Sequence, residues 1–170
     1  RALVGFMPAV TDAIGRPEPG EFERRLAETL EGGHGDSVNS VLCYMDLDRF
    51  KAVNDTCGHL AGDNMLREVA KLIRDQVRDS DFVARLGGDE FGMLLVGCPL
   101  EKARQIADDV VRAVADYRFV WKDKIFNIGV SVGLVELSRE SGSLEDVISA
   151  ADSACYIAKK QGGHVQVYSA

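Results

Sequence analysis

The sequence contains few cysteines, no long apolar run and no excess of positive charge. Its four cysteines form no C-x-x-C pair, which argues against a zinc site, and they are too few for the disulfide framework of a small secreted scaffold. We therefore expect reduced and mostly buried thiols, as in a cytoplasmic protein. No apolar stretch approaches the ~20 residues of a membrane-spanning helix. No membrane segment is expected, although modules outside this sequence could tether it to a membrane.

The charge balance is acidic, with 27 Asp and Glu against 20 Lys and Arg and a formal net charge of −7 over 170 residues. Binding to a nucleic-acid polymer needs clustered Lys and Arg, so the composition argues against it. A small anionic ligand held through metal ions remains compatible with this charge. The 46% hydrophobic and 28% charged residues are typical of one ordinary globular domain.

The order of apolar patterns predicts an α+β fold. Short apolar runs predict strands at 41–45, 82–86, 91–96, 126–135 and 165–168. Apolar residues at helical spacing predict helices at 21–32, at 60–77, after Pro99 and at 144–158. The run at 41–45 lacks polar alternation, so we expect a strand buried on both faces and stopped by Asp46. Gly87 and Gly88 separate two strand-like runs, which predicts a hairpin with a type I′ turn.

This order is β-α-β-β-α-β with an added helix and strand, the split βαβ plan. The plan has an antiparallel-rich central sheet with helices on one face, and its first strand lies centrally beside the hairpin. We expect a single domain over 1–170, with a turn-rich lead-in at 1–20 and a core at 21–170. Because the chain starts at Arg1 without a methionine, we also expect it to come from a longer multidomain protein.

Two acidic clusters follow the predicted strands. Asp46 and Asp48 are two residues apart and point the same way in a strand, while Asp89 and Glu90 follow the glycine pair. Each cluster by itself is compatible with a solvated turn or a loop cap. Because the central strand lies beside the hairpin, however, Asp46 is expected to meet Asp89. Converging carboxylates with an open side suit Mg²⁺ or Mn²⁺, completed by the phosphates of a nucleotide.

A third polar cluster runs from Asn54 to His59 and continues at Gly62 and Asp63. An amide offers a donor and an acceptor, and a carboxylate accepts two N–H bonds, so together they suit the edge of a guanine base. The alternative is a loop that caps a helix beginning near Leu60, with Asp63 in its first turn. Taken in isolation, this cluster favours the capping interpretation.

Taken together, the clusters resemble one known family. The string RLGGDEF at 85–91 is similar to the name-giving motif of the GGDEF domain, the diguanylate cyclase family. The resemblance extends, in the family's order over 41–168, to DLDRFKAVND at 46–55, GH at 58–59, GD at 62–63, SVG at 131–133, AD at 151–152 and ACYIAK at 154–159. The strings CYMDLD and NDTCGH look most like GGDEF domains of tandem GGDEF–EAL proteins. The implied fold is palm-like, of the nucleotide-cyclase type, with helices packed around the sheet.

The resemblance implies that two GTP molecules condense into cyclic di-GMP with release of two pyrophosphates, across a homodimer of domains. It also implies covalently linked sensor and EAL domains. Asp46, Asp89 and the backbone carbonyl of Leu47 would bind Mg²⁺ or Mn²⁺. Asp89 and Glu90 would be catalytic, with Glu90 assisting deprotonation of the ribose 3′-hydroxyl. The implied substrate-binding residues are Asn54 and Asp63 for guanine, His59 in support, and Phe50, Lys51 and Lys159 for the phosphates. Arg78 and Asp81 have the R-x-x-D spacing of the family's inhibitory site for cyclic di-GMP.

Two segments depart from the family pattern. Glu18 and Pro19 replace an Asn-Arg pair before the first helix, and Gly163 stands where the family usually has a phosphate-contacting arginine. Loss of that charge-assisted contact is expected to weaken GTP binding by about one to two orders of magnitude. An active cyclase is the preferred interpretation, and the intact metal set argues against a mere scaffold, since its carboxylates would repel one another without a cation. The alternatives are a weak or inactive module that binds GTP or cyclic di-GMP and controls a fused EAL phosphodiesterase, and a dimerisation scaffold with vestigial motifs.

Overall fold

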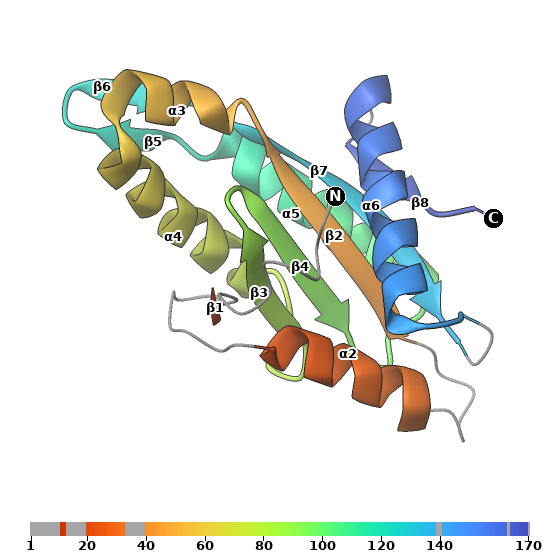
Figure 1. Ribbon diagram of the computed structural model, residues 1–170. Coiled ribbons are helices and arrows are strands. Elements are labelled where there is room, and N and C mark those ends of the chain that lie inside the picture. Colours follow the sequence, from red (N-terminus) through yellow and green to blue (C-terminus); the bar gives the residue numbers. More distant parts are fainter. Residues whose placement is uncertain (1–10, 13–19, 33–39, 139–140, 163, 170) are drawn as a thin grey trace.

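The computed structural model describes residues 11–12, 20–32, 40–138, 141–162 and 164–169 (Figure 1). The strands are β1 (Thr11–Asp12), β2 (Ser40–Asp48), β3 (Phe82–Gly87), β4 (Glu90–Leu95), β5 (Phe119–Trp121), β6 (Lys124–Phe126), β7 (Gly129–Leu137) and β8 (Val165–Val167). The helices are α2 (Glu21–Gly32), α3 (Phe50–Cys57), α4 (His59–Asp75), α5 (Leu100–Asp116) and α6 (Leu144–Gln161). None of these described helices is long and apolar enough to cross a membrane.

The main sheet has six strands in the order β1-β3-β4-β2-β7-β8. Neighbouring strands of this sheet pair antiparallel, except for β7 and β8, which pair parallel. The first long strand, β2, therefore lies between the β3–β4 hairpin and β7. This order confirms the predicted α+β class and the split βαβ core.

Helices cover both faces of the sheet. One core joins α4 and α5 to the face that carries Met45, and the other joins α2 and α6 to the face that carries Tyr44. Both side chains are at most 1% exposed. The expectation of helices on one face was therefore wrong, because β2 is apolar on both faces and each face needs a helical cover. The arrangement of helices around the sheet as a whole is confirmed.

The region after β2 differs from the prediction in two ways. Strand β2 does not stop at Asp46 but pairs with β7 as far as Asp48. The next residues form a helix, α3, where a loop was expected, because Phe50 and Val53 are buried against the α4 side of the core. Helices α3 and α4 are separated only by Gly58, whose φ of 88° is in the region that favours glycine.

Two further predictions need correction, the type of the β3–β4 turn and the single strand at 126–135. The β3–β4 turn lies at Gly88–Asp89, and neither Gly87 nor Gly88 has a positive φ, so it is not a type I′ turn. A register shift between Arg85 and Gly87 places Gly87 opposite Glu90 and moves the turn. The single strand expected at 126–135 is instead the end of a separate β5–β6 hairpin followed by β7.

Helix α6 lies very close to β7 at Gly133. A Cβ atom at this glycine would lie 2.3 Å from the Cys155 amide nitrogen and 2.4 Å from the Ala151 carbonyl oxygen. Because both of these atoms belong to the helix backbone, they cannot move aside as a flexible side chain would. The missing side chain of Gly133 therefore lets α6 approach the sheet, and it brings the end of α6 over β2.

We expect Gly133→Ala to lower the free energy of unfolding by about 2–3 kcal/mol, because the added methyl overpacks a backbone–backbone contact. Urea unfolding followed by circular dichroism measures the change. Gly88→Ala is the matched control, since a Cβ there meets nothing within 4 Å. Equal stabilities of the two variants would contradict the proposed close contact.

Candidate active site

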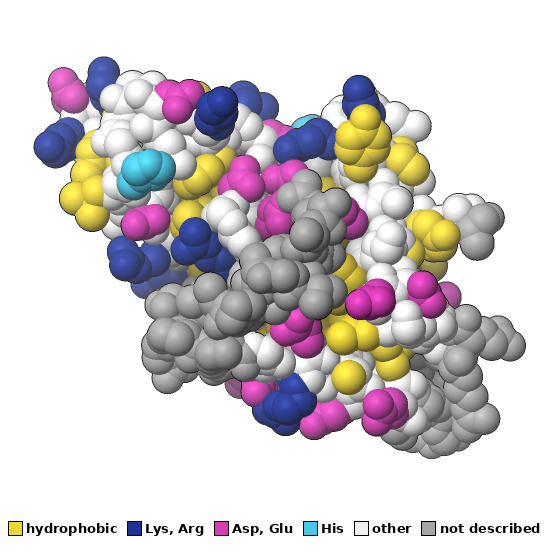
Figure 2. All heavy atoms as spheres, viewed as in Figure 1, with side chains coloured by type: hydrophobic (Ala, Val, Ile, Leu, Met, Phe, Trp, Pro, Cys, Tyr) yellow, Lys and Arg dark blue, Asp and Glu magenta, His cyan; other side chains and the backbone are white. Residues whose placement is uncertain are grey.

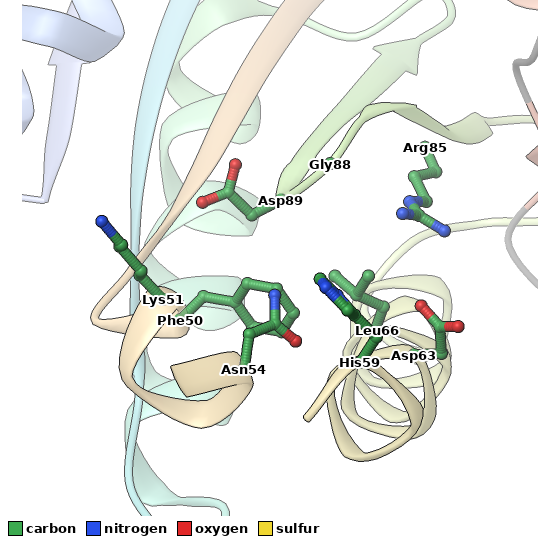
Figure 3. A pocket seen from close by; sticks show the side chains of 9 residues that line it. All are labelled: Phe50, Lys51, Asn54, His59, Asp63, Leu66, Arg85, Gly88 and Asp89. Atoms are coloured by element: carbon green, nitrogen blue, oxygen red, sulfur yellow. The ribbon is translucent and has the colours of Figure 1, made fainter. Parts of the chain in front are cut away.

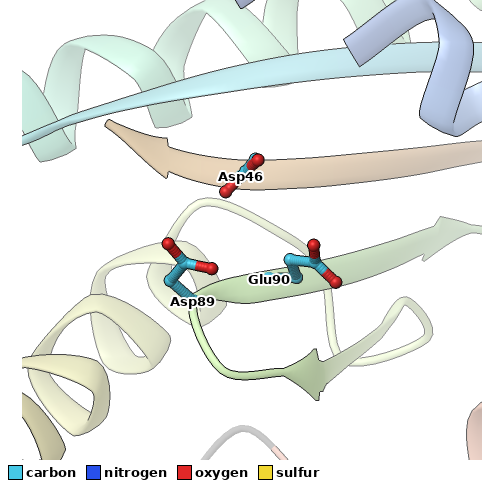
Figure 4. A group of neighbouring side chains, drawn as sticks. All are labelled: Asp46, Asp89 and Glu90. Carbon is cyan, nitrogen blue, oxygen red and sulfur yellow. The ribbon is translucent and has the colours of Figure 1, made fainter. Parts of the chain in front are cut away.

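Three carboxylates converge where β2 and β4 lie side by side. In the antiparallel register Asp46 lies opposite Glu90, and Asp89 belongs to the turn that precedes β4. One oxygen of each carboxylate lies within 4.8 Å of the others (Figure 4). Such proximity is repulsive without a nearby cation, and hard oxygen ligands suit Mg²⁺ or Mn²⁺. The site residues therefore fit a divalent metal ion.

Glu90 is held inside the protein by a residue that sequence analysis did not single out. The Tyr44 hydroxyl donates to Glu90 Oε1 at 2.8 Å, and Glu90 is 5% exposed. Tyr44 lies two residues before Asp46 in β2, on the same face of the strand. That spacing is the signal by which it could have been found. Tyr44 thus orients the carboxylate that was expected to assist proton removal.

The turn that carries Asp89 is attached to β2 through the backbone. The Leu47 amide donates to the Asp89 carbonyl at 3.1 Å. The Leu47 side chain points to the α4 side of the sheet and is 2% exposed, as expected from the alternation of side chains between Asp46 and Asp48. Only the backbone of Leu47 therefore faces the acidic cluster.

Lys159, near the end of α6, contacts the acidic end of β2. Its Nζ lies 3.2 Å from Asp46 Oδ2 and 3.4 Å from Asp48 Oδ1, and it donates to the Leu47 carbonyl at 3.5 Å. Partial burial alone would lower the pKa of Lys159, but the two carboxylates together raise it above its ordinary value. Lys159 therefore carries a positive charge at neutral pH.

A cavity of roughly 420 Å³ lies next to the acidic cluster (Figure 3). Its lining includes Asp89 together with Phe50, Lys51, Asn54, His59, Asp63, Leu66, Arg85 and Gly88. Five of the expected substrate-binding residues are thus brought together, and Asp89 belongs to both the cavity and the acidic cluster. Figure 3 shows Lys51 and Asp63 toward opposite ends of this cavity, with Asn54 between them. Lys159, Asp46 and Glu90 are not among the lining residues.

The cavity also contains residues that sequence analysis gave no role. Arg85 comes from β3, and its Nε donates to the Gly87 carbonyl at 3.3 Å, while Leu66 comes from α4. A charged residue inside an otherwise apolar strand was the available signal for Arg85. Asp63 is an exposed residue of α4, which begins at His59, and no side chain caps that helix. The capping alternative for this cluster is therefore wrong.

Asn54 is placed against Gly62 of the neighbouring helix. Among the described residues, Asn54 Oδ1 is a buried side-chain atom with no hydrogen-bond partner. A Cβ at Gly62 would lie only 1.9 Å from this oxygen. Gly62 has an ordinary helical backbone, so its small size matters here for the space that it leaves to the Asn54 amide.

Arg78 and Asp81 form a closed turn between α4 and β3, at the end of β4 opposite to Glu90. The fully buried Asp81 carboxylate accepts bonds of 3.0–3.2 Å from the Arg78 amide, from the Arg78 guanidinium and from the Val96 amide. The Arg78 side chain is 55% exposed and also donates to the Val96 carbonyl at 2.7 Å. Asp81 therefore stabilises the turn, while Arg78 presents its guanidinium at the surface. The departures at Glu18, Pro19 and Gly163 lie outside the described residues.

The comparisons with known proteins agree with this fold and identify its family. Residues 20–164 match the family described as "Diguanylate cyclase, GGDEF domain". The chain is 45% identical over 148 residues to the probable diguanylate cyclase DgcE of Escherichia coli K12, an alignment that spans 86% of this chain but 13% of DgcE. The solved GGDEF domain of TpbB from Pseudomonas aeruginosa superposes with a TM-score of 0.85 at 32% identity, covering 92% of each chain. The GGDEF domain of Caulobacter crescentus DgcB, solved in complex with c-di-GMP, gives 0.84 at 26% identity, covering 92% of this chain and 94% of that one.

Fold and site together define an α+β domain with a candidate metal centre beside a polar cavity. The chain belongs to the GGDEF-domain family of diguanylate cyclases. It spans only a small fraction of the length of DgcE.

Proposed function

We propose that this chain condenses two GTP molecules into cyclic di-GMP in a metal-dependent reaction. In each half-reaction a ribose 3′-hydroxyl attacks the α-phosphorus of the other GTP, a new phosphodiester forms, and pyrophosphate leaves. The observation that carries the proposal is the position of Asp89, which joins the acidic cluster to the cavity lined by the expected nucleotide-binding residues. A nucleotide bound there would have its phosphates beside the metal ligands.

The acidic cluster would hold the metal. Asp46, Asp89 and the Leu47 carbonyl would bind Mg²⁺ or Mn²⁺, which when bound neutralises phosphate charge and acidifies the attacking hydroxyl. Glu90 would accept the proton, and its bond from Tyr44 keeps the carboxylate oriented toward the cluster. The protein supplies mainly position and charge, as phosphoryl transfer requires.

The cavity would hold the rest of the nucleotide. Asp63 would accept the N–H groups of guanine and Asn54 would bond to its edge, with His59 alongside. Lys51, Lys159 and the backbone near Phe50 would contact the phosphates, and Arg85 adds a further positive charge to the cavity lining. One cavity would hold one GTP, so two chains must face each other to bring both hydroxyls to both α-phosphates. We therefore infer a homodimer as the active form.

We expect purified chain with Mg²⁺ and GTP to form cyclic di-GMP and pyrophosphate, and Asp89→Asn to reduce the rate about a thousandfold or more through loss of a metal ligand. Chromatography of the nucleotides measures turnover. Asp75→Asn, an exposed change at the end of α4, is the control and should leave the rate unchanged. The proposal would be refuted if a folded sample formed no cyclic di-GMP at chain concentrations high enough for dimers.

Gly62→Ala is expected to weaken GTP binding about tenfold, because the added methyl displaces the Asn54 amide. The helical backbone of Gly62 favours alanine, but the methyl would also lie 3.2 Å from the buried Phe50 ring, so we expect a small decrease in melting temperature. Calorimetry with a non-hydrolysable GTP analogue measures the affinity. The control is the same change in an Asn54→Ala background, where it should have little further effect. Equal losses in the two backgrounds would show that Gly62 does not act through Asn54.

The R-x-x-D turn is proposed as a product-inhibition site, with Arg78 contacting the phosphates of cyclic di-GMP. The Arg78→Ala variant should form cyclic di-GMP at the initial rate of the wild-type chain, but its reaction should no longer slow down as cyclic di-GMP accumulates. Progress curves with added cyclic di-GMP measure this, and Arg112→Ala, another exposed arginine, is the control. Replacing Asp81 is a poorer test because its buried carboxylate holds the turn together. Undiminished inhibition of the Arg78 variant would refute this site.

A further inference from the structure

The Lys159 ammonium lies on the atoms that are proposed to hold the metal. Its Nζ is 3.2 Å from Asp46 Oδ2 and 3.5 Å from the Leu47 carbonyl oxygen. Both of these oxygens belong to the proposed metal-ligand set. A positive charge at this position compensates the cluster of carboxylates, but it also opposes the entry of a second cation.

The position of Lys159 is set by a helix and not by a flexible loop. Helix α6 approaches β7 closely at Gly133, and the Cys155 thiol, one turn before Lys159, donates to the Ser131 carbonyl at 3.3 Å. The side chain of Lys159 thus starts from a well-packed backbone, although it is itself 40% exposed. Its contact with Asp46 follows from the way in which α6 packs on the sheet.

A second carboxylate, that of Asp48, also contacts the Lys159 ammonium. Asp48 Oδ1 lies 3.4 Å from Lys159 Nζ, and the Ser131 hydroxyl donates to the Asp48 carboxylate at 3.2–3.3 Å. A Cβ at Gly129 would lie 3.3 Å from Asp48 Oδ2, so the missing side chain of Gly129 leaves room for this carboxylate beside β7. Asp48 does not belong to the converging group of Asp46, Asp89 and Glu90.

We propose that Lys159 is a tethered counter-cation that competes with the divalent metal for Asp46, and that Asp48 is the positioning residue that retains it when the metal enters. With a divalent metal on Asp46, the Lys159 ammonium would leave Asp46 and remain on Asp48, where it would still be available to the phosphates of the nucleotide. This inference rests on the proposed function, because it takes Asp46 as a metal ligand. It assigns Asp48 a role outside the metal-ligand set.

The test measures Mn²⁺ binding without nucleotide, by electron paramagnetic resonance of free Mn²⁺, in the 170-residue chain. Removal of the competing charge in Lys159→Gln should tighten Mn²⁺ binding about five- to tenfold, although the same variant should turn over GTP more slowly. Lys160→Gln removes the neighbouring exposed lysine and should leave the affinity unchanged. Circular dichroism verifies that each variant is folded.

The Asp48→Asn variant distinguishes a role of Asp48 in positioning Lys159 from the general effect of its negative charge on metal binding. Without Asp48 the ammonium stays on Asp46, so Mn²⁺ binding should weaken clearly in the wild-type background and much less in the Lys159→Gln background. A pure long-range effect of the lost negative charge would be equal in the two backgrounds and would overturn the role of Asp48.

The outcomes distinguish this inference from the proposed function. Measurable Mn²⁺ binding that Lys159→Gln leaves unchanged or weakens would overturn the competition, while the metal site and the cyclase proposal would stand. Absence of Mn²⁺ binding in both the wild-type chain and Lys159→Gln would overturn the metal site, and the competition with it.

Discussion

The antiparallel pairing of β2 with β4 is the constraint on which the candidate site depends. It places Asp46 opposite Glu90, and the bond from the Leu47 amide to the Asp89 carbonyl holds the turn against the end of β2. Three carboxylates are thereby held together at a cost that only a cation relieves. Apolar packing on both faces of β2 offsets that cost, because Met45 and Tyr44 anchor the strand in two separate cores.

The two helices that complete the site approach through glycines that act by their small size. Gly133 lets the backbone of α6 lie against β7, and Gly62 leaves room for the Asn54 amide between α3 and α4. Neither glycine needs an unusual backbone conformation. In both places the absent side chain decides where a functional side chain lies: Lys159 over the acidic end of β2, and Asn54 in the cavity.

The fold class, the central position of the first strand and the meeting of Asp46 with Asp89 were predictable, because short apolar runs and helical period-3.6 patterns occur in an order that few topologies accommodate. The failures have local causes. Helix α3 is only eight residues long, too short for a clear helical pattern, and it is stabilised by burial of Phe50 and Val53, which is a tertiary effect. The turn type was wrong because the irregular pairing after Arg85 shifts the turn onward to Gly88–Asp89, and a glycine pair alone does not define the register.

By itself, the sequence determined which chemical groups are available and in what order: the acids after two strands, the amide and carboxylate near α3 and α4, the R-x-x-D turn and a lysine at the end of a long helix. Only the tertiary structure decided which of them touch. The ion pairs of Lys159 with Asp46 and Asp48, the bond from Tyr44 to Glu90, and the saturation of Asp81 by local and distant donors are all of this kind. These contacts depend on how closely helices pack on the sheet and on strand register. Both are set by the fit of side-chain volumes across the whole core, which local patterns do not encode.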